Sequence, residues 1–407
     1  MRCRAAALAA AVLISAEKTT MEGSAMRGQK WIRAVAAGAA LTLLAVACGD
    51  DGGSTASGDS SSGLLTKVKL QLQWVTQAQF AGYFAAVEQG YYKEQGLDVS
   101  ILEAAVDTVP AKVLADDGAD FAVSWVPKAL QTREAGADVV QIAQVFQKSG
   151  TRQVSFKDKN ITTPTAFKGK KVGNWGFGNE YEVFAAITKA GLDPAKDVTN
   201  VQQQFDMVAM LAGEIDAAEA MTYNEYAQVL EAKNPKTGKL YTPQDFNVVD
   251  YNTEGVAMLQ DALWANGKKL ANDKTYQETT TKFLTASLEG WIYCRDNAQA
   301  CADLVVAKGS KLGKSHQLWQ MNEVNKLIWP STTGIGAIDK TAYDQTVKIA
   351  QGTKNLEGKT VLSKAPDAAA LNTTYVTKAI AALEAKKLYT KGVAFKPITV
   401  TLAEGGQ

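Results

Sequence analysis

Aromatic and amide side chains recur together along this chain, at places that directly follow predicted strands. The candidate binding residues are Trp74, Gln79, Trp125, Asn174, Phe177, Asn179, Glu180, Tyr223, Asn224 and Glu225. Aromatic rings supply faces for stacking, while amides and carboxylates supply hydrogen bonds to the edge of a ring. These residue types therefore predict a cleft that binds a small, flat heterocycle.

Several of these candidates also have a purely structural interpretation. Trp74 and Trp125 could fill the core of a lobe, and the glycines of 176–178 could form an ordinary turn instead of an anion-binding nest. Glu225 could recognise an amino group, or it could complement the dipole of a helix that begins there. The sequence leaves these alternatives open.

The sequence contains no familiar catalytic arrangement. His316 is the only histidine, and it falls in a C-terminal region that is predicted to be helical, away from every predicted strand end. We find no Ser-His-Asp set, HExxH sequence, Walker A loop or zinc-binding spacing. We therefore expect no catalytic residue, cofactor or metal.

The elements that must position the candidate residues alternate between strand and helix. The first part predicts strands at 68–72, 97–102, 121–124 and 139–146 and helices at 79–89, 110–115 and 129–135. The pattern then restarts, with a strand ending near 173, a helix at 180–190, a strand at 198–203, a helix at 223–231 and a return strand at 255–263. This alternation predicts an α/β fold with two lobes and mainly parallel sheets, followed by C-terminal helices from about 273.

The N-terminal region reads as an export signal. Positive charges after Met26 precede an apolar run at 34–47 and then Cys48, in the order of a signal peptide. The sequence LAVAC resembles a bacterial lipobox, although Ala45 stands where Leu is usual, so we expect Cys48 to carry a lipid. Translation from Met21 or Met26 fits this signal better than translation from Met1.

These features give a domain plan for the whole chain. We assign 1–48 to the leader, 49–66 to a flexible Gly/Ser/Asp tether, 67–160 to lobe 1, 161–254 to lobe 2, and 255–407 to a return to lobe 1 plus the C-terminal helices. The expected location is outside the cytoplasm, with the membrane contacted through the lipid anchor only.

Two cysteines, Cys294 and Cys301, remain after the predicted processing. A continuous helix would hold their Cα atoms about 10 Å apart, beyond the disulfide limit of about 7 Å. The polar residues 295–297 are suited to a break between two helices, which would bring the cysteines together. We expect a disulfide here, and two free buried thiols are the alternative.

Several segments resemble the NMT1-type family of solute-binding proteins. They are LQLQW at 70–74, FAGYFAA at 80–86, GYYKEQGLDV at 90–99, DFAVSW at 120–125, LAGEIDA at 211–217 and MTYNE at 221–225. The resemblance covers about 68–291. It implies a type II periplasmic-binding-protein fold, with two doubly wound lobes joined by a two-strand hinge and a helical C-terminal part. It also implies partnership with the permease and ATPase of an ABC importer.

Charge and residue type narrow the ligand within that family. Lys and Arg total 43 against 42 Asp and Glu, a formal charge of +1, which disfavours nucleic acid as a partner. Sulfonate and nitrate receptors need concentrated cationic or N–H donors, whereas the candidate positions are aromatic, amide and acidic. We therefore expect a monomer that binds a thiamin pyrimidine precursor or riboflavin. A sulfonate or nitrate receptor, or a thiamin-pyrimidine synthase of the same fold, is the alternative.

Overall fold

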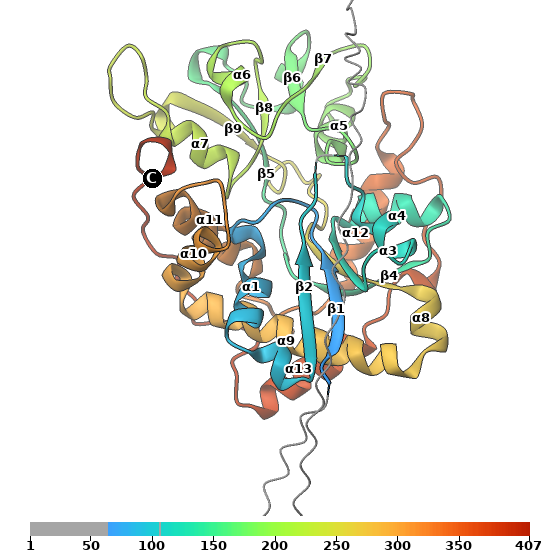
Figure 1. Ribbon diagram of the computed structural model, residues 1–407. Coiled ribbons are helices and arrows are strands. Elements are labelled where there is room, and N and C mark those ends of the chain that lie inside the picture. Colours follow the sequence, from blue (N-terminus) through green and yellow to red (C-terminus); the bar gives the residue numbers. More distant parts are fainter. Residues whose placement is uncertain (1–63, 106) are drawn as a thin grey trace, which may run out of the picture. The chain divides into compact units, whose positions relative to one another are not determined.

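Five strands form the sheet of lobe 1 in the computed structural model, which describes residues 64–105 and 107–407 (Figure 1). They are β1 (Thr66–Gln71), β2 (Leu97–Leu102), β3 (Phe121–Ser124), β4 (Val139–Gln144) and β10 (Ala262–Asn266), in the order β2-β1-β3-β10-β4. β1 is parallel to β2 and β3, whereas β10 runs antiparallel to β3 and β4. Every residue of β3 and β4 is buried, so central β3 and edge strand β4 are both covered on their two faces.

Helices on both sides cover this first sheet. They include α1 (Ala81–Glu88), α2 (Tyr91–Glu94), α3 (Pro110–Ala115), α4 (Val126–Glu134), α8 (Gly267–Asn272), α9 (Lys274–Asp296) and α13 (Thr374–Ala385). A short 3-10 turn, η1 (Ala78–Phe80), leads into α1. Pro110 and Pro127 occupy the first turns of α3 and α4, where proline's missing N–H costs no helical hydrogen bond.

Lobe 2 repeats the strand order of lobe 1. Its strands are β5 (Thr151–Phe156), β6 (Lys171–Asn174), β7 (Thr199–Gln202), β8 (Ala218–Met221) and β9 (Phe246–Asp250). β5 pairs antiparallel with β8 and β9, and β6 pairs parallel with β7. A parallel bridge between Val172 and Ala217 joins the two groups, with the Gly173 amide 2.8 Å from the Ala217 carbonyl. The resulting order is β7-β6-β8-β5-β9, with the antiparallel strand again in fourth place.

The chain passes twice between the two sheets, through residues 145–150 and 251–261, which stand in the place of the expected two-strand hinge but form no strand themselves. The amide of Gly150 donates to Gln260 Oε1 at 2.8 Å, and Asn252 Nδ2 donates to the Ser149 carbonyl at 2.8 Å. The Val145 amide donates to the Asp261 carbonyl at 3.2 Å. The two crossing segments are therefore tied to each other along their length.

Three sequence predictions about lobe boundaries differ from the structure. The return strand predicted at 255–263 is wrong, since that apolar run is largely the buried crossing segment and β10 begins only at Ala262. β5 and β9 were not predicted, because β5 buries Gln153 and Ser155 and so lacks an apolar alternation. β5 belongs to the second sheet, so the boundary predicted at residue 160 lies too late in the chain.

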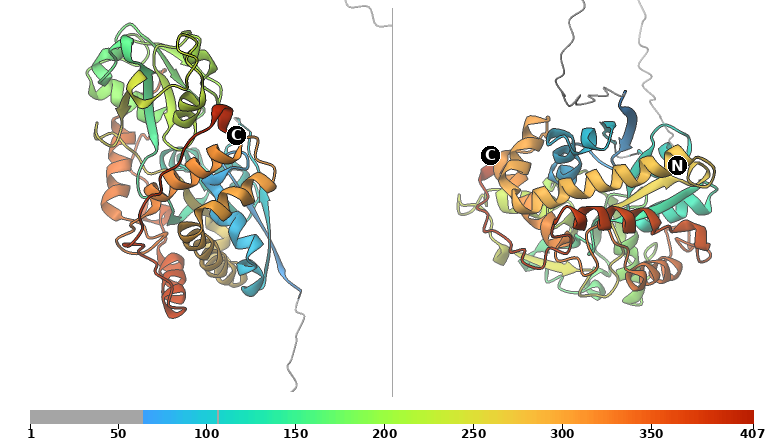
Figure 2. Two further views of the ribbon diagram at one scale, coloured as in Figure 1. Left: turned by 90° about the vertical axis from the view of Figure 1, so that its left-hand side faces the viewer. Right: turned by 90° about the horizontal axis from the view of Figure 1, so that it is seen from below.

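The C-terminal part is helical, as predicted, and part of it lies against lobe 2 (Figure 2). It contains α9, α10 (Ala298–Ala307), α11 (Lys314–Ile328), α12 (Lys340–Gly352) and α13. A disulfide joins Cys294 to Cys301, whose Cα atoms are 5.6 Å apart, because α9 ends at Asp296 and α10 starts at Ala298. The final turn, η6 (Glu404–Gly406), returns to α7 (Glu225–Glu231), where Glu404 pairs with Lys233 at 2.5 Å.

The predicted leader, Cys48 and nearly all of the predicted tether lie outside the described residues. Among the residues that are described, no helix has both the length and the apolar character needed to cross a membrane.

Candidate ligand-binding site

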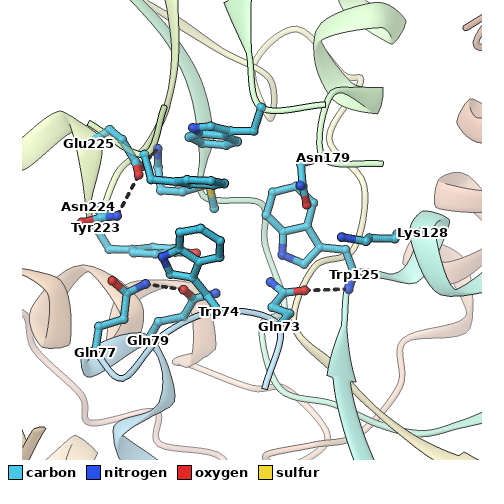
Figure 3. Close-up of a pocket in the computed structure, with 13 residues that line it drawn as sticks. Gln73, Trp74, Gln77, Gln79, Trp125, Lys128, Asn179, Tyr223, Asn224 and Glu225 are labelled. Carbon is cyan, nitrogen blue, oxygen red and sulfur yellow. Dashed lines mark hydrogen bonds between the residues drawn. The ribbon is translucent and has the colours of Figure 1, made fainter. Parts of the chain in front are cut away.

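A pocket lies between the two lobes, at the carboxyl ends of their strands (Figure 3). It is lined by Gln73, Trp74, Gln77, Gln79, Trp125, Lys128, Trp175, Asn179, Phe205, Met221, Tyr223, Asn224 and Glu225. The loops after β1 and β3 supply the lobe 1 side, and the loops after β6, β7 and β8 supply the lobe 2 side. Open α/β sheets present their ligand sites at this edge, because parallel strands all end there.

Seven of the ten predicted binding residues line this pocket, and three do not. Asn174 ends β6 and donates to Asn200 Oδ1 at 3.3 Å. Phe177 is 52% exposed and lies at φ 54°, so the loop turns its ring toward solvent. The Glu180 carboxylate accepts from the Gly178 amide at 2.8 Å. That the other seven contact a ligand stays a prediction.

Six lining residues were not among the predicted contacts, namely Gln73, Gln77, Lys128, Trp175, Phe205 and Met221. Trp175 and Phe205 could have been found by the same strand-end argument, because they closely follow β6 and β7. Nothing local in the sequence distinguishes Lys128 from the many lysines that face solvent.

Aromatic rings from the two lobes meet inside the pocket. The ring centroids of Trp74 and Phe205 are 3.7 Å apart at an interplanar angle of 40°. Phe205 also lies parallel to Trp175, with centroids 6.0 Å apart and planes inclined by 8°. Trp74 is therefore not simply a core residue of lobe 1, since its ring contacts the opposite lobe across the pocket.

The lobe 1 wall is organised by Asp261, a buried carboxyl group at the end of the second crossing segment. Asp261 Oδ1 accepts from Gln73 Nε2 and Trp125 Nε1, both at 2.8 Å, and Oδ2 accepts from Gln79 Nε2 at 2.9 Å. Gln79 Oε1 in turn accepts from Gln77 Nε2 at 2.7 Å. Burial raises the pKa of Asp261 to about 7, and these hydrogen bonds oppose that shift. Asp261 thus positions three pocket side chains at once.

The lobe 2 wall is organised by Glu225 in the first turn of α7. Its Oε2 accepts from the Met221 amide at 3.0 Å, and its Oε1 accepts from Asn224 Nδ2 at 2.7 Å. Burial raises the pKa of Glu225 to about 7. A carboxyl group that gains its proton near neutral pH can accept from an amino group or donate to a ring nitrogen, according to its protonation.

His316 lies directly behind this wall, so the expectation that it sits away from every strand end is wrong. Its Nε2 is 2.9 Å from Asn224 Oδ1, and its Nδ1 is 2.9 Å from Glu231 Oε1. The ring is fully buried on α11 and does not line the pocket. Both ring nitrogens have protein partners, which gives His316 a positioning role at the contact between α11 and lobe 2.

Lys128 is the one pocket-lining residue with a basic side chain. It lies in the first turn of α4 and is 5% exposed. Burial lowers its pKa to about 8, and the nearby Glu180 carboxyl group opposes this shift. Over the described residues, no group of three or more His, Cys, Asp or Glu side chains is arranged to hold a metal ion.

Comparison with known proteins places this chain in a family. Residues 77–300 match the family model described as NMT1/THI5 like, which is more than half of the chain. A Haemophilus influenzae protein named for thiamine biosynthesis is 24% identical over 292 residues, covering 70% of this chain and 86% of its own.

Two further relatives are named as binding proteins. The formylaminopyrimidine-binding protein of Halalkalibacterium halodurans is 22% identical over 62% of this chain and 72% of its own. The riboflavin-binding protein RibY of Chloroflexus aurantiacus is 24% identical over 67% of this chain and 77% of its own.

The fold itself matches a solved periplasmic protein. The nitrate-binding protein NrtA of Synechocystis superposes with a TM-score of 0.54 at 14% identity, over 81% of this chain and 92% of that one. At that identity the match speaks to fold alone. The chain therefore belongs to the NMT1/THI5-like family and has the type II periplasmic-binding-protein fold.

Proposed function

We propose that this protein is the extracytoplasmic solute-binding component of an ABC importer, and that it binds a small aromatic heterocycle between its lobes. The observation that carries this proposal is the composition of the pocket. Its two walls bring Trp74, Trp175 and Phe205 together with buried amide and carboxyl groups. Flat rings stack on such faces and are oriented by hydrogen bonds at their edges.

An aminopyrimidine is the ligand that this pocket suits best, with riboflavin second. Glu225 has one bond from the protein to each carboxyl oxygen, which leaves further lone pairs for an exocyclic amino group or a ring nitrogen. The names of two relatives, a formylaminopyrimidine-binding protein and a riboflavin-binding protein, support the same two ligands. Sulfonate or nitrate would need several convergent cations, whereas Lys128 is the single basic side chain in the lining.

A thermal-shift panel tests the ligand class. It should contain a formylaminopyrimidine, the corresponding aminopyrimidine, riboflavin, an aliphatic sulfonate and nitrate. A ligand present at 100 times its dissociation constant adds about 2.7 kcal/mol to the free energy of unfolding. Stabilisation by the sulfonate or nitrate, with none by the heterocycles, would refute the proposal.

A pair of variants tests the stacking. Trp74→Ala should weaken heterocycle binding by about 1–3 kcal/mol, the range measured for stacking of bases on aromatic side chains. Lys170→Ala, outside the pocket, is the control and should leave the affinity unchanged. Equal affinities for the two variants would show that Trp74 does not stack on the ligand.

Attachment to the membrane through a lipidated Cys48 is part of the proposal. It rests on the signal-peptide order and the LAVAC sequence. Labelled palmitate should enter the wild-type protein but not Cys48→Ser, and Cys48→Ser should be released to the medium or keep its leader. Equal labelling of the two proteins would exclude this anchor.

A synthase of the same fold is the second candidate, and one observation favours it. Lys128 is a buried amine with its pKa lowered to about 8, and such an amine can form a Schiff base with an aldehyde cofactor. Against it, the imidazole of His316 is buried behind the pocket with both nitrogens engaged. Borohydride reduction in the presence of pyridoxal phosphate should leave Lys128 unlabelled if the protein is a receptor.

A further inference from the structure

Lys128 is a charged group that the proposed aromatic recognition leaves unexplained. Its side chain reaches the pocket from the first turn of α4, beside Trp125 and Asn179 (Figure 3). Only 5% of its surface is exposed. The stem is therefore buried while the ammonium group opens on the pocket, away from bulk water, where a charge is costly unless a partner compensates it.

The protein supplies no such partner among the residues that the structure describes. The backbone carbonyl of Lys128 accepts from Thr132, but its ammonium group makes neither a hydrogen bond nor an ion pair there, and the neighbouring Glu180 carboxylate accepts from the Gly178 amide at 2.8 Å. Glu180 attracts Lys128 only through space, and burial remains the larger influence, since the pKa of Lys128 falls to about 8. The three N–H donors of Lys128 are thus held at the pocket wall, open to the pocket and without a protein acceptor among the described residues.

Lobe 2 fixes the path of the lysine stem. Gly178 lies against it at φ 88°, and a Cβ atom at that position would be 3.1 Å from Lys128 Cγ and 3.3 Å from Cδ. A side chain at residue 178 would therefore meet the stem as well as strain the backbone. The loop between β6 and α5 (Tyr181–Lys189) thus packs on the stem and directs the ammonium group along the pocket wall.

The pocket has opposite chemistry at its two ends. Figure 3 shows Lys128 and Glu225 on opposite sides of the aromatic residues. Glu225 can accept from a donor on the ring, whereas Lys128 can only donate. A ligand with an amino donor at the Glu225 end and an acceptor oxygen at the Lys128 end would satisfy both.

We propose that Lys128 donates a hydrogen bond to an acceptor oxygen on a substituent of the bound heterocycle. The protein then selects rings that carry a carbonyl or anionic oxygen opposite the edge that contacts Glu225. This inference rests on the proposed function and adds a specificity to it. An aminomethyl substituent at that end would bring a second ammonium group toward Lys128, and like charges repel. A formyl group on the same nitrogen removes that charge and supplies a carbonyl oxygen.

The test is a comparison of two ligands with two proteins by isothermal titration calorimetry. The ligands are a formylaminopyrimidine and the same aminopyrimidine without the formyl group; the proteins are the wild type and Lys128→Met. Methionine keeps an unbranched stem for the contact with Gly178 and removes the charge. The wild type should prefer the formylated ligand by about 10- to 100-fold, the range for hydrogen bonds to charged groups. Lys128→Met should lose most of that preference.

Two controls keep the outcomes separate. Lys170→Met, which alters a lysine outside the pocket, should keep the wild-type preference. Lys128→Met should melt close to the wild-type temperature, because the ammonium group opens on the pocket and its removal breaks no hydrogen bond or ion pair with the described residues. A loss of preference caused by misfolding would appear instead as a lowered melting temperature and weaker binding of both pyrimidines.

The result that overturns the inference is an unchanged preference in Lys128→Met, or labelling of Lys128 by pyridoxal phosphate and borohydride. Failure of the proposed function looks different, since the wild type would then bind neither pyrimidine nor riboflavin. Equal binding of both pyrimidines by the wild type refutes the role of Lys128 alone and leaves the proposed function standing.

Discussion

The two walls of the pocket are both organised by a buried carboxyl group, but the hydrogen bonds that hold them span very different distances along the chain. Asp261 accepts hydrogen bonds from the side chains of Gln73, Gln79 and Trp125, which lie 188, 182 and 136 residues away in sequence. Glu225 accepts hydrogen bonds from the backbone amide of Met221, four residues away, and from the side chain of the neighbouring Asn224. The lobe 1 wall thus depends on the complete fold, whereas the lobe 2 wall is set largely within one strand-to-helix turn.

This difference links the lobe 1 wall to the hinge. Asp261 ends one crossing segment, and its carbonyl accepts from the amides of Val145 and Phe146 in the other. Its carboxyl group meanwhile holds the side chains that face the ligand. Two-lobed proteins of this type close by hinge motion, and here one residue belongs to both the hinge and the pocket. We infer that substitutions in the lobe 1 wall change ligand affinity and the free energy of unfolding together. Substitutions in the lobe 2 wall can more readily change one of these without the other.

The largest effect should come from Asp261→Ala. Two buried donors, on Gln79 and Trp125, and the half-buried donor on Gln73 would lose their acceptor, at about 1–3 kcal/mol for each buried donor before relaxation, so we expect the free energy of unfolding to fall by about 3–5 kcal/mol. Urea denaturation measures this loss, and ligand affinity should fall with it. Asp367→Ala, which removes an exposed partner of Arg133, is the control and should cost about 1 kcal/mol or less. If both variants lost a similar free energy of unfolding, Asp261 would not organise the lobe 1 wall and the two walls would not differ in this way.

Removing the disulfide should lower the stability of the protein without changing either wall of the pocket. Replacing Cys294 and Cys301 by serine opens a short loop, and we expect a loss of about 2–3 kcal/mol in the free energy of unfolding. Neither cysteine lines the pocket, so heterocycle affinity should stay within about twofold. Weaker binding by the double variant would mean that the α9–α10 junction supports the site and that stability and binding are not separable there.

The pH dependence of stability should carry a contribution from Glu225 in the lobe 2 wall. Its pKa is about 7 in the folded protein, against about 4.3 for an unfolded glutamate. The folded state binds more protons between these values, so this group's contribution to stability is complete below about pH 4.3 and is lost as the pH rises through 7. Between pH 5 and pH 7 the loss should be about 2 kcal/mol.

Glu225→Gln isolates that contribution because glutamine cannot titrate. Subtracting its urea-derived stability profile from that of the wild type should leave a difference that falls over pH 5 to 7. Glu214→Gln, an exposed position, should leave the wild-type slope intact. A difference profile that is flat in pH would show that Glu225 is ionised throughout this range.

The smallest effect should come from His316→Gln. Glutamine can keep one of the two contacts that the imidazole makes with Asn224 and Glu231, so we expect a loss of about 1 kcal/mol in the free energy of unfolding. Ligand affinity should fall only a few-fold, because Glu225 keeps its own local bonds. Lys314→Gln, exposed on the same helix, is the control. A loss as large as that of Asp261→Ala would mean that the lobe 2 wall also depends on distant contacts.

Local signals in the sequence were enough for many of the helices and strands. The strands predicted at 97–102 and 121–124 and the helix at 110–115 have those same bounds in the structure, because glycines, a proline and short apolar runs mark them. The strand-end argument also brought seven predicted residues to one pocket. Asn174, Phe177 and Glu180 are not among the residues that line this pocket, because a strand end does not show which way the following loop turns.

What the sequence determined by itself is thus the family resemblance, the alternation of strand and helix, and the residue types that follow each strand, since all of these lie within short stretches of chain. Tertiary structure alone decided that β5 joins the second sheet, that Asp261 holds the lobe 1 wall, that His316 backs Asn224 and that Lys128 faces the pocket. The physical reason is that buried polar groups must find partners wherever the fold brings them. Those partners come from distant parts of the chain, and their spacing in sequence carries no periodic signal.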